Sequence, residues 1–301
     1  MQNDTLSIRK PKKWHKDRFA KIISFSILFC VSIIFLLPII YMIGTSFRTA
    51  TDISRRPSAI FPTADGFTWG YYAQIFSGST TTDGASVLNS LKNSFIVSGT
   101  SVVWAIIVDG LAAYAFTFLR FKGRVRTFAF IIFTMAIPGV IGTTIRFTAF
   151  AKLGQALDVM SQAWYYFVWL IIPGAVDVYH VFLIKNYFDS IPYEIIESAR
   201  SDGASDFKIF ASIILPLARS TFLLVGLFTF TSSWNNLFWA NMIVGPHKQW
   251  QTITVYLSTF DLTQKGLNMA ASVVSLLPIL VVFMFVQNKM IDGLASTGVK
   301  K

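Results

Sequence analysis

The residues best placed for chemistry lie in one polar segment, residues 185–219, between the fourth and fifth apolar runs. Ser190-Ile191-Pro192 is a helix-start signal, and a glycine such as Gly203 can adopt the left-handed conformation that ends a helix. Ser205 then restarts a helical pattern that reaches Pro216. We therefore predict a short helix over residues 192–202, a glycine turn and a second helix. The residues that could act in recognition of another molecule are Glu197, Ala199, Asp202, Gly203, Ala204, Leu215 and Pro216.

The predicted hairpin combines small side chains with an apolar stripe. Ser198 and Ala204 would let another protein approach closely, and Ile195, Ile196 and Ala199 share one helical face at i, i+1, i+4 spacing. Taken alone, this pattern leaves two alternatives open. The hairpin could dock on a partner protein, or it could lie on the surface of a bilayer.

The rest of the sequence shows no pattern that is typical of a catalytic or metal site. The histidines have neither metal-ligand spacing nor a nucleophile partner: His15, His180 and His247. Residues 293–300 have the glycine spacing of a phosphate-binding loop, but Val299 stands where the lysine belongs. The single cysteine, Cys30, excludes an internal disulfide. We therefore predict that this chain is not an enzyme and binds no metal or cofactor itself.

The composition places the chain in a membrane. Apolar residues make up 53% and charged residues 14% of the 301 residues, which is too apolar for an ordinary soluble domain. Six stretches approach or exceed the roughly 20 helical residues that cross a bilayer, and such spans must be helical to satisfy their backbone polar groups. They are residues 22–47, 93–119, 127–151, 163–184, 220–244 and 266–288. We expect an all-α polytopic protein with a six-helix transmembrane domain over residues 22–291, tails at 1–21 and 292–301, and an external loop at 48–92.

The basic residues indicate the orientation. Of the 26 Lys and Arg residues, 18 lie on the side that holds both termini and residues 185–219. The positive-inside rule predicts that this side is cytoplasmic. The net charge of +11 is distributed in short clusters beside the spans, such as residues 120–126. Anionic lipid headgroups are therefore the predicted partner of these clusters, and nucleic acid is not.

Three ionisable residues fall inside predicted spans. Arg146 lies in the outer half of the third, Asp109 near the middle of the second, and Asp177 in the fourth, one turn before His180. Such groups cost about 2.5–3.5 kcal/mol on insertion scales, so each should face the helix bundle or water. Arg146 could form a salt bridge with one of the aspartates, or it could contact a transported solute.

The fifth predicted span carries a polar and aromatic cluster that includes Trp234, Asn235, Asn236, Trp239 and Asn241. Aromatic faces stack on sugar rings and amides bond to hydroxyls, so the cluster suits a carbohydrate path. Alternatively, the asparagines bond across helices and hold them together. The candidate path residues are thus Arg146, Trp234, Asn235 and Asn236.

Aromatic residues in the external loop, Trp69, Tyr71 and Tyr72, allow two interpretations as well. They could bind a ligand or lie in the interfacial belt of the membrane. The belt is the favoured interpretation, because amphipathic aromatic side chains gather at the headgroup level in general.

The chain resembles the permease subunits of bacterial ABC sugar importers, specifically the second, maltose-type permease of the carbohydrate-uptake family. The resemblance covers nearly the whole chain and rests on the pattern of residues 185–219 and on five further segments. Ser198 stands where the family usually has alanine, a small-for-small change. The further segments are Leu111–Phe116 leading into Arg120–Arg124, Ile137–Gly139, Ser233–Asn236, Met269–Ser272 and Gly293–Val299.

The resemblance implies the fold of a type I importer permease in the bacterial cytoplasmic (inner) membrane. In this family the short helix of the loop sits in a cleft of an ATP-hydrolysing subunit, so residues 185–219 would be the coupling loop. The implied partners are a second permease, two ATP-binding subunits that bind ATP and magnesium, and an extracytoplasmic solute-binding protein.

The implied function is the inward transport of a carbohydrate, an oligosaccharide, by alternating access. Family members usually carry neutral residues at several of the depths of Arg146, Asp109 and Asp177. This departure is compatible with an acidic or amino-bearing sugar. The alternative function is that of an ATP-independent secondary transporter or channel, although the inverted repeats common in that class are not evident.

Overall fold

The computed structural model describes residues 14–77, 86–174, 176–260 and 263–298, and helices dominate these residues. The extended pairing recorded there is an isolated antiparallel bridge between Arg48 and Phe67. The predicted all-α class is confirmed.

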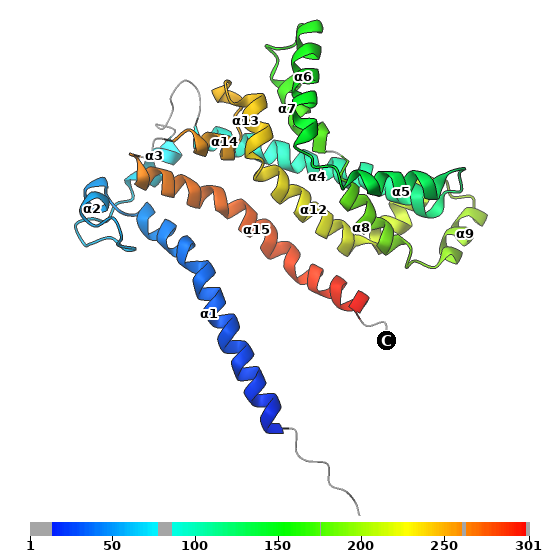
Figure 1. Ribbon diagram of the computed structural model, residues 1–301, viewed down its shortest axis with the longest axis horizontal. Coiled ribbons are helices and arrows are strands. Elements are labelled where there is room, and N and C mark those ends of the chain that lie inside the picture. Colours follow the sequence, from blue (N-terminus) through cyan, green and yellow to red (C-terminus); the bar gives the residue numbers. More distant parts are fainter. Residues whose placement is uncertain (1–13, 78–85, 175, 261–262, 299–301) are drawn as a thin grey trace, which may run out of the picture.

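Among the described residues, three single helices are long and apolar enough to cross a membrane: α1 (Trp14–Ser46), α4 (Val87–Phe118) and α15 (Lys265–Gly298). α12 (Arg219–Trp234) packs along α4 and α15, and α1 packs on α15 (Figure 1). No residue in the apolar window of α1 is fully buried within this chain, so most of its surface stays exposed although one side contacts α15. Its surface is therefore left for lipid or for another subunit.

The fourth and fifth predicted spans are not continuous helices. The fourth consists of α7 (Ala163–Ile171), η1 (Ile172–Gly174) and α8 (Val178–Phe188). It bends by 51° at the break between Gly174 and Val178, shortly after Pro173, which cannot donate a backbone hydrogen bond. The fifth ends as α12 at Trp234 and restarts as α13 (Leu237–Val244). At that break the Asn236 side chain accepts the Trp239 N–H at 3.2 Å, which caps the new helix.

The third predicted span, 127–151, is also divided. It falls into α5 (Arg124–Thr134) and α6 (Ile141–Ala156), with Pro138 in the connection. Counting bent helix pairs as single spans, the described residues hold up to five candidate spans. The third, fourth and fifth predicted spans are therefore each built from more than one helix in the described residues.

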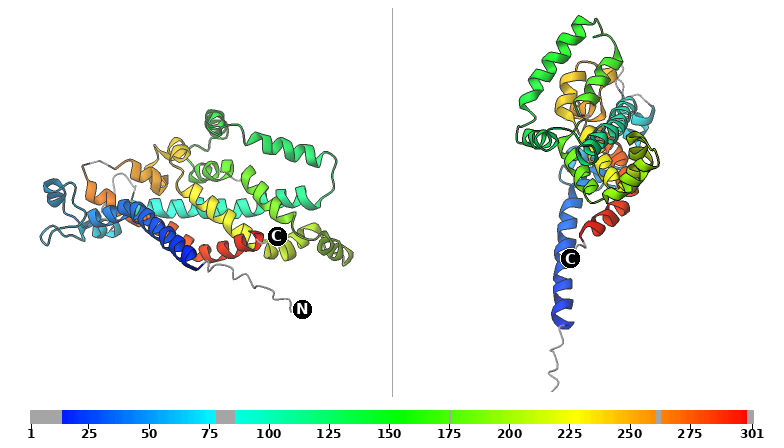
Figure 2. Two further views of the ribbon diagram at one scale, coloured as in Figure 1. Left: turned by 60° about the horizontal axis from the view of Figure 1, so that its bottom comes forward. Right: turned by 90° about the vertical axis from the view of Figure 1, so that its right-hand side faces the viewer.

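Short helices form both ends of the long axis. α2 (Ala50–Arg55) and α3 (Gly70–Ser77) lie at one end of the long axis, and α9 (Tyr193–Ser201) lies at the other (Figure 1). α15 runs from the α2–α3 end toward the α9 end, whereas α1 leads from the α2 end away from the other helices (Figure 1 and Figure 2). Helix α1 begins inside the predicted tail 1–21, and α15 continues into the predicted tail 292–301.

A buried arginine organises the α2 end. Arg48 is 0% exposed and donates hydrogen bonds to Asp52 Oδ2, to Ala59 O and to Arg56 O, each at 2.6 Å. Arg56 binds the other carboxylate oxygen of Asp52 at 2.7 Å. The hydrogen bond from Arg48 holds the pKa of Asp52 below its usual range. This network fixes the turn after α1.

Candidate functional site

The polar segment forms the hairpin that the sequence predicts. α9 is followed by Gly203 in the left-handed conformation, with φ +79°, and by α10 (Asp206–Ile209), whose N-cap Ser205 accepts the Lys208 N–H at 3.3 Å. The Ala204 N–H closes α9 by donating to Ala199 O at 3.0 Å. A π-helical turn, η2 (Phe210–Ile214), and α11 (Leu215–Leu217) then lead into α12.

The hairpin has one face turned to the protein and one turned away. Ile196 is 0% exposed and Ala199 is 9% exposed, in a core that also contains Ile209 and Ile214. Ile195 is 37% exposed, so it does not belong to the buried stripe, because an adjacent residue lies about 100° around the helix. The predicted apolar stripe is thus correct for two of its three residues.

Of the seven predicted loop residues, four are exposed: Glu197, Asp202, Gly203 and Pro216. Ala204 and Leu215 are half-buried, and Ala199 is buried. The small Ala199 side chain supports α9 from inside, where a larger one would push the helix off its core. The exposed residues form a polar surface on a hairpin that is held from behind.

An ion pair that the sequence did not reveal fastens the hairpin to α4. Arg200 Nη2 lies 2.8 Å from Asp206 Oδ1, and the Tyr114 hydroxyl donates to the same oxygen at 2.9 Å. Arg200 also donates to Phe118 O at 3.4 Å. The bond to Asp206 raises the pKa of the Arg200 guanidinium, which stays charged at physiological pH. The pair is partly exposed, so its main effect is to orient the hairpin and it adds less than about 1 kcal/mol of stability.

A cavity of about 390 Å³ lies deeper in the fold, between α4, α6, the break before α8, and the α12–α13 break. Two of the four predicted path residues, Arg146 and Asn236, line it, as do Asp177, His180 and Trp239. Five hydroxyl side chains complete its polar wall: Ser101, Thr143, Thr229, Ser232 and Ser233. The sequence did not indicate them, because they are scattered through apolar helices.

Arg146 forms no salt bridge with an aspartate in the described part of the chain, so that alternative is wrong. Its guanidinium donates to Gly139 O at 3.0 Å and to Gly142 O at 3.4 Å. It also lies over the Trp239 ring, with Cζ 5.7 Å from the centroid. The indole N–H of Trp239 donates to Trp169 O at 2.8 Å, which fixes the ring.

The two aspartates hold the break before α8. Asp109 is 0% exposed; its Oδ1 accepts the Asp177 N–H at 3.2 Å, and its Oδ2 lies 3.3 Å from His180 Nδ1. Asp177 caps α8 by accepting the Tyr179 N–H at 2.8 Å. The Asp109 carboxylate on α4 thus contacts the break and α8, and the Asp177 carboxylate contacts the first turn of α8.

Trp234 and Asn235 do not line the cavity. Trp234 is 2% exposed, stacks on Phe230 with ring centroids 5.4 Å apart, and meets Phe95 edge-on at 5.1 Å. It is a core residue. The predicted polar and aromatic cluster of five residues thus divides into a core tryptophan, Trp234, two exposed asparagines, Asn235 and Asn241, and two residues that reach the cavity, Asn236 and Trp239.

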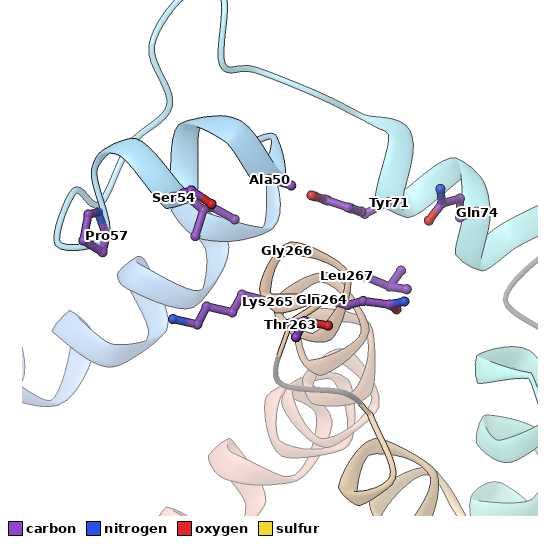
Figure 3. Close-up of a pocket in the computed structure, with 11 residues that line it drawn as sticks. Ala50, Ser54, Pro57, Tyr71, Gln74, Thr263, Gln264, Lys265, Gly266 and Leu267 are labelled. Atoms are coloured by element: carbon purple, nitrogen blue, oxygen red, sulfur yellow. The ribbon is translucent and has the colours of Figure 1, made fainter.

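The external loop contributes a second hollow, of about 590 Å³, between α2, α3 and the start of α15. Figure 3 shows the Tyr71 side chain between these elements, beside Gly266. Trp69 and Tyr72 instead pack against Phe47, with ring centroids 4.8 and 5.1 Å apart. Of the three external aromatic residues, Tyr71 alone lines this hollow.

Comparisons with known proteins agree with this architecture. Residues 106–292 match the family model described as binding-protein-dependent transport system inner membrane component. The maltodextrin transport system permease protein MdxG of Bacillus subtilis (strain 168) is 30% identical over 236 residues, 75% of this chain and 82% of that protein. The inner membrane ABC transporter permease protein YcjP of Escherichia coli (strain K12) is 31% identical over 263 residues, 86% of this chain and 89% of that protein.

One solved structure, a bacterial ABC transporter involved in the import of the acidic polysaccharide alginate, shares the fold with a TM-score of 0.76. It is 23% identical, and the match covers 91% of this chain and 97% of that chain. The family match, the relatives and the shared fold converge. This chain belongs to the binding-protein-dependent ABC importer permeases of the carbohydrate-uptake type, which are non-catalytic, multi-pass subunits of the inner membrane.

Proposed function

We propose that this chain is one of two permease subunits that carry an oligosaccharide into the cytoplasm, with ATP hydrolysis in two partner subunits as the energy source. The observation that carries the proposal is the hairpin of α9 and α10. Its polar residues Glu197, Asp202 and Gly203 are exposed, while its other face is packed on the core and fastened by Arg200. An exposed surface that is packed on the protein core behind it can pass the movement of a docked subunit on to the membrane helices.

The orientation follows from the same feature. The hairpin would face the cytoplasm, where the ATP-binding subunits hold ATP and magnesium. The end of α15 points to that side (Figure 2). The segments that the positive-inside rule assigns to the cytoplasm hold most of the Lys and Arg residues of the sequence. Both termini would then be cytoplasmic. The α2–α3 end would receive the solute from the extracytoplasmic binding protein.

The solute class is inferred from two independent features. MdxG is named for maltodextrin transport. The cavity offers Trp239 and Asn236 together with several hydroxyl groups, and these are groups that bind sugar rings and their hydroxyls. Alternating access would expose this cavity first to one side of the membrane and then to the other.

Purification of the tagged chain from its native membrane in mild detergent tests the proposal. We expect recovery of a second permease and two ATP-binding subunits, with ATPase activity that rises when binding protein and sugar are added. Uptake of sugar into liposomes by this chain alone, without ATP, would instead establish the secondary transporter.

A further inference from the structure

Arg146 has hydrogen-bond donors left over. A guanidinium carries five N–H donors, and here it gives two hydrogen bonds to backbone carbonyls, of which the one to Gly142 O is long at 3.4 Å. Within the described residues no acidic side chain pairs with it. A cation at this depth requires compensation, because ionisable groups inside a membrane protein pair with each other or face water. Arg146 faces the cavity.

The other ionisable groups in or behind the cavity wall contact α8 or one another, and none of them pairs with Arg146 in the described residues. Asp177 caps α8, Asp109 is buried behind the wall, and His180 lies against Asp109. Asp177 is exposed and keeps its negative charge on the α8 wall of the cavity, because a capping N–H does not neutralise a carboxylate. Arg146, on the α6 wall, forms no ion pair with it or with any other acidic side chain of the described residues.

The surroundings of Arg146 define what could neutralise it. Its guanidinium lies over the Trp239 ring, and that ring is itself fixed by its N–H bond to Trp169 O. A planar, fixed guanidinium fits a carboxylate or a phosphate through two parallel hydrogen bonds. Thr143 and Asn236 in the same wall can bond to the hydroxyls of a sugar.

We propose that this cavity binds an anionic group, a carboxylate or a phosphate ester, on the transported carbohydrate, and that Arg146 is the residue that selects it. The inference rests on the proposed transport function. It specifies, beyond the transport function, that the solute is negatively charged and that Arg146 binds its charged group.

Thermal stabilisation of the complex purified from its native membrane, without the binding protein, tests the assignment. The probes are D-glucuronate, glucose 6-phosphate and D-glucose. We expect an acidic probe to bind more tightly than glucose, and Arg146→Gln to weaken its binding by about 10- to 100-fold while glucose binding stays unchanged. Whether glucuronate or the phosphate ester is preferred identifies the anion.

Two further variants keep the result interpretable. Arg126→Gln removes an exposed arginine on α5, outside the cavity, and should leave the preference intact. Arg146→Lys keeps the positive charge but loses the planar guanidinium that can donate two parallel hydrogen bonds. It should retain part of the preference for acidic probes, and it can be measured even if the glutamine variant folds poorly.

An equal affinity for all three probes in the unmodified complex would overturn the proposal, as would an unchanged preference in Arg146→Gln. Loss of the second permease on purification of Arg146→Gln, with probe preference unchanged, would assign the arginine to a carboxylate of that subunit. Absence of ATP-driven uptake of any sugar would refute the transport function. The binding preference is measured separately from that uptake.

Discussion

Gly203 offers a direct test of the coupling hairpin, because its substitution separates folding from docking. Its φ of +79° belongs to the left-handed region, where an L-residue costs about 1–2 kcal/mol. A Cβ added there meets no heavy atom within 4 Å. A tryptophan at this position should therefore fit the isolated chain and project into the space where an ATP-binding subunit would dock.

The chain supplies a matched control. Gly123, between α4 and α5, has nearly the same conformation, with φ +85°, and an added Cβ would lie 3.9 Å from Thr127 Oγ1. Gly123→Trp thus carries the same backbone cost at another exposed turn. That cost is small beside a typical folding stability of 5–15 kcal/mol, and both variants should lose a similar few degrees of thermal midpoint.

The assay is sugar uptake per ATP hydrolysed in liposomes that contain the complete complex. We expect Gly203→Trp to lower this ratio at least about tenfold, since an obstruction worth only 1.4 kcal/mol at the docking surface already gives that factor. Gly123→Trp should stay within about twofold of the unmodified complex. If Gly203→Trp transports as well as Gly123→Trp, the hairpin is not the docking element.

Three other perturbations give distinct outcomes. Arg200→Ala breaks the half-exposed pair with Asp206, so it should change unfolding free energy by less than about 1 kcal/mol yet lower uptake per ATP; unchanged uptake would exclude an orienting role. The pKa of Asp52 is lowered by Arg48, so this stabilisation should be complete above about pH 4 and be lost as pH falls through the folded pKa. Pepsin should then cleave residues 48–77 faster below pH 4, and Asp52→Asn should be cleaved faster already at pH 5; equal rates at pH 5 would contradict this. Trp234→Phe should lower the thermal midpoint without altering probe preference, because Trp234 is core and does not line the cavity; a changed preference would return it to the solute path.

The hairpin could be predicted because its signals act over a few residues. The turn at Gly203 and the cap at Ser205 are each decided by neighbours in the chain, and the structure has both. The cap at Asn236 is an equally local signal, since an asparagine followed by an apolar run is typical of a helix start. The cap was not predicted, because the asparagines of the fifth span were interpreted as sugar contacts or as hydrogen bonds between helices.

Whether Arg146 forms an ion pair could not be predicted, because this depends on distances between segments far apart in the sequence. Asp109 and Asp177 are 68 residues apart, yet the Asp177 backbone N–H donates to the Asp109 carboxylate, while the Asp177 carboxylate accepts the Tyr179 N–H. The break before α8 depends on the same bond. Pro173 makes a kink possible, but the buried Asp109 decides how the freed backbone N–H of Asp177 is satisfied.

The breaks also explain how the hairpin and the cavity can act together. α8 begins at the cavity with Asp177 and His180 and ends just before the hairpin, and α12 begins just after the hairpin and ends at the cavity with Ser232 and Ser233. α12 has 16 residues, about 24 Å at 1.5 Å per residue, so it can transmit a displacement as a rigid body. Under the proposed function, movement of the hairpin moves two walls of the cavity. The breaks before α8 and after α12 are the points where backbone rotation can absorb that movement, since hinges are formed by a few residues at the ends of helices.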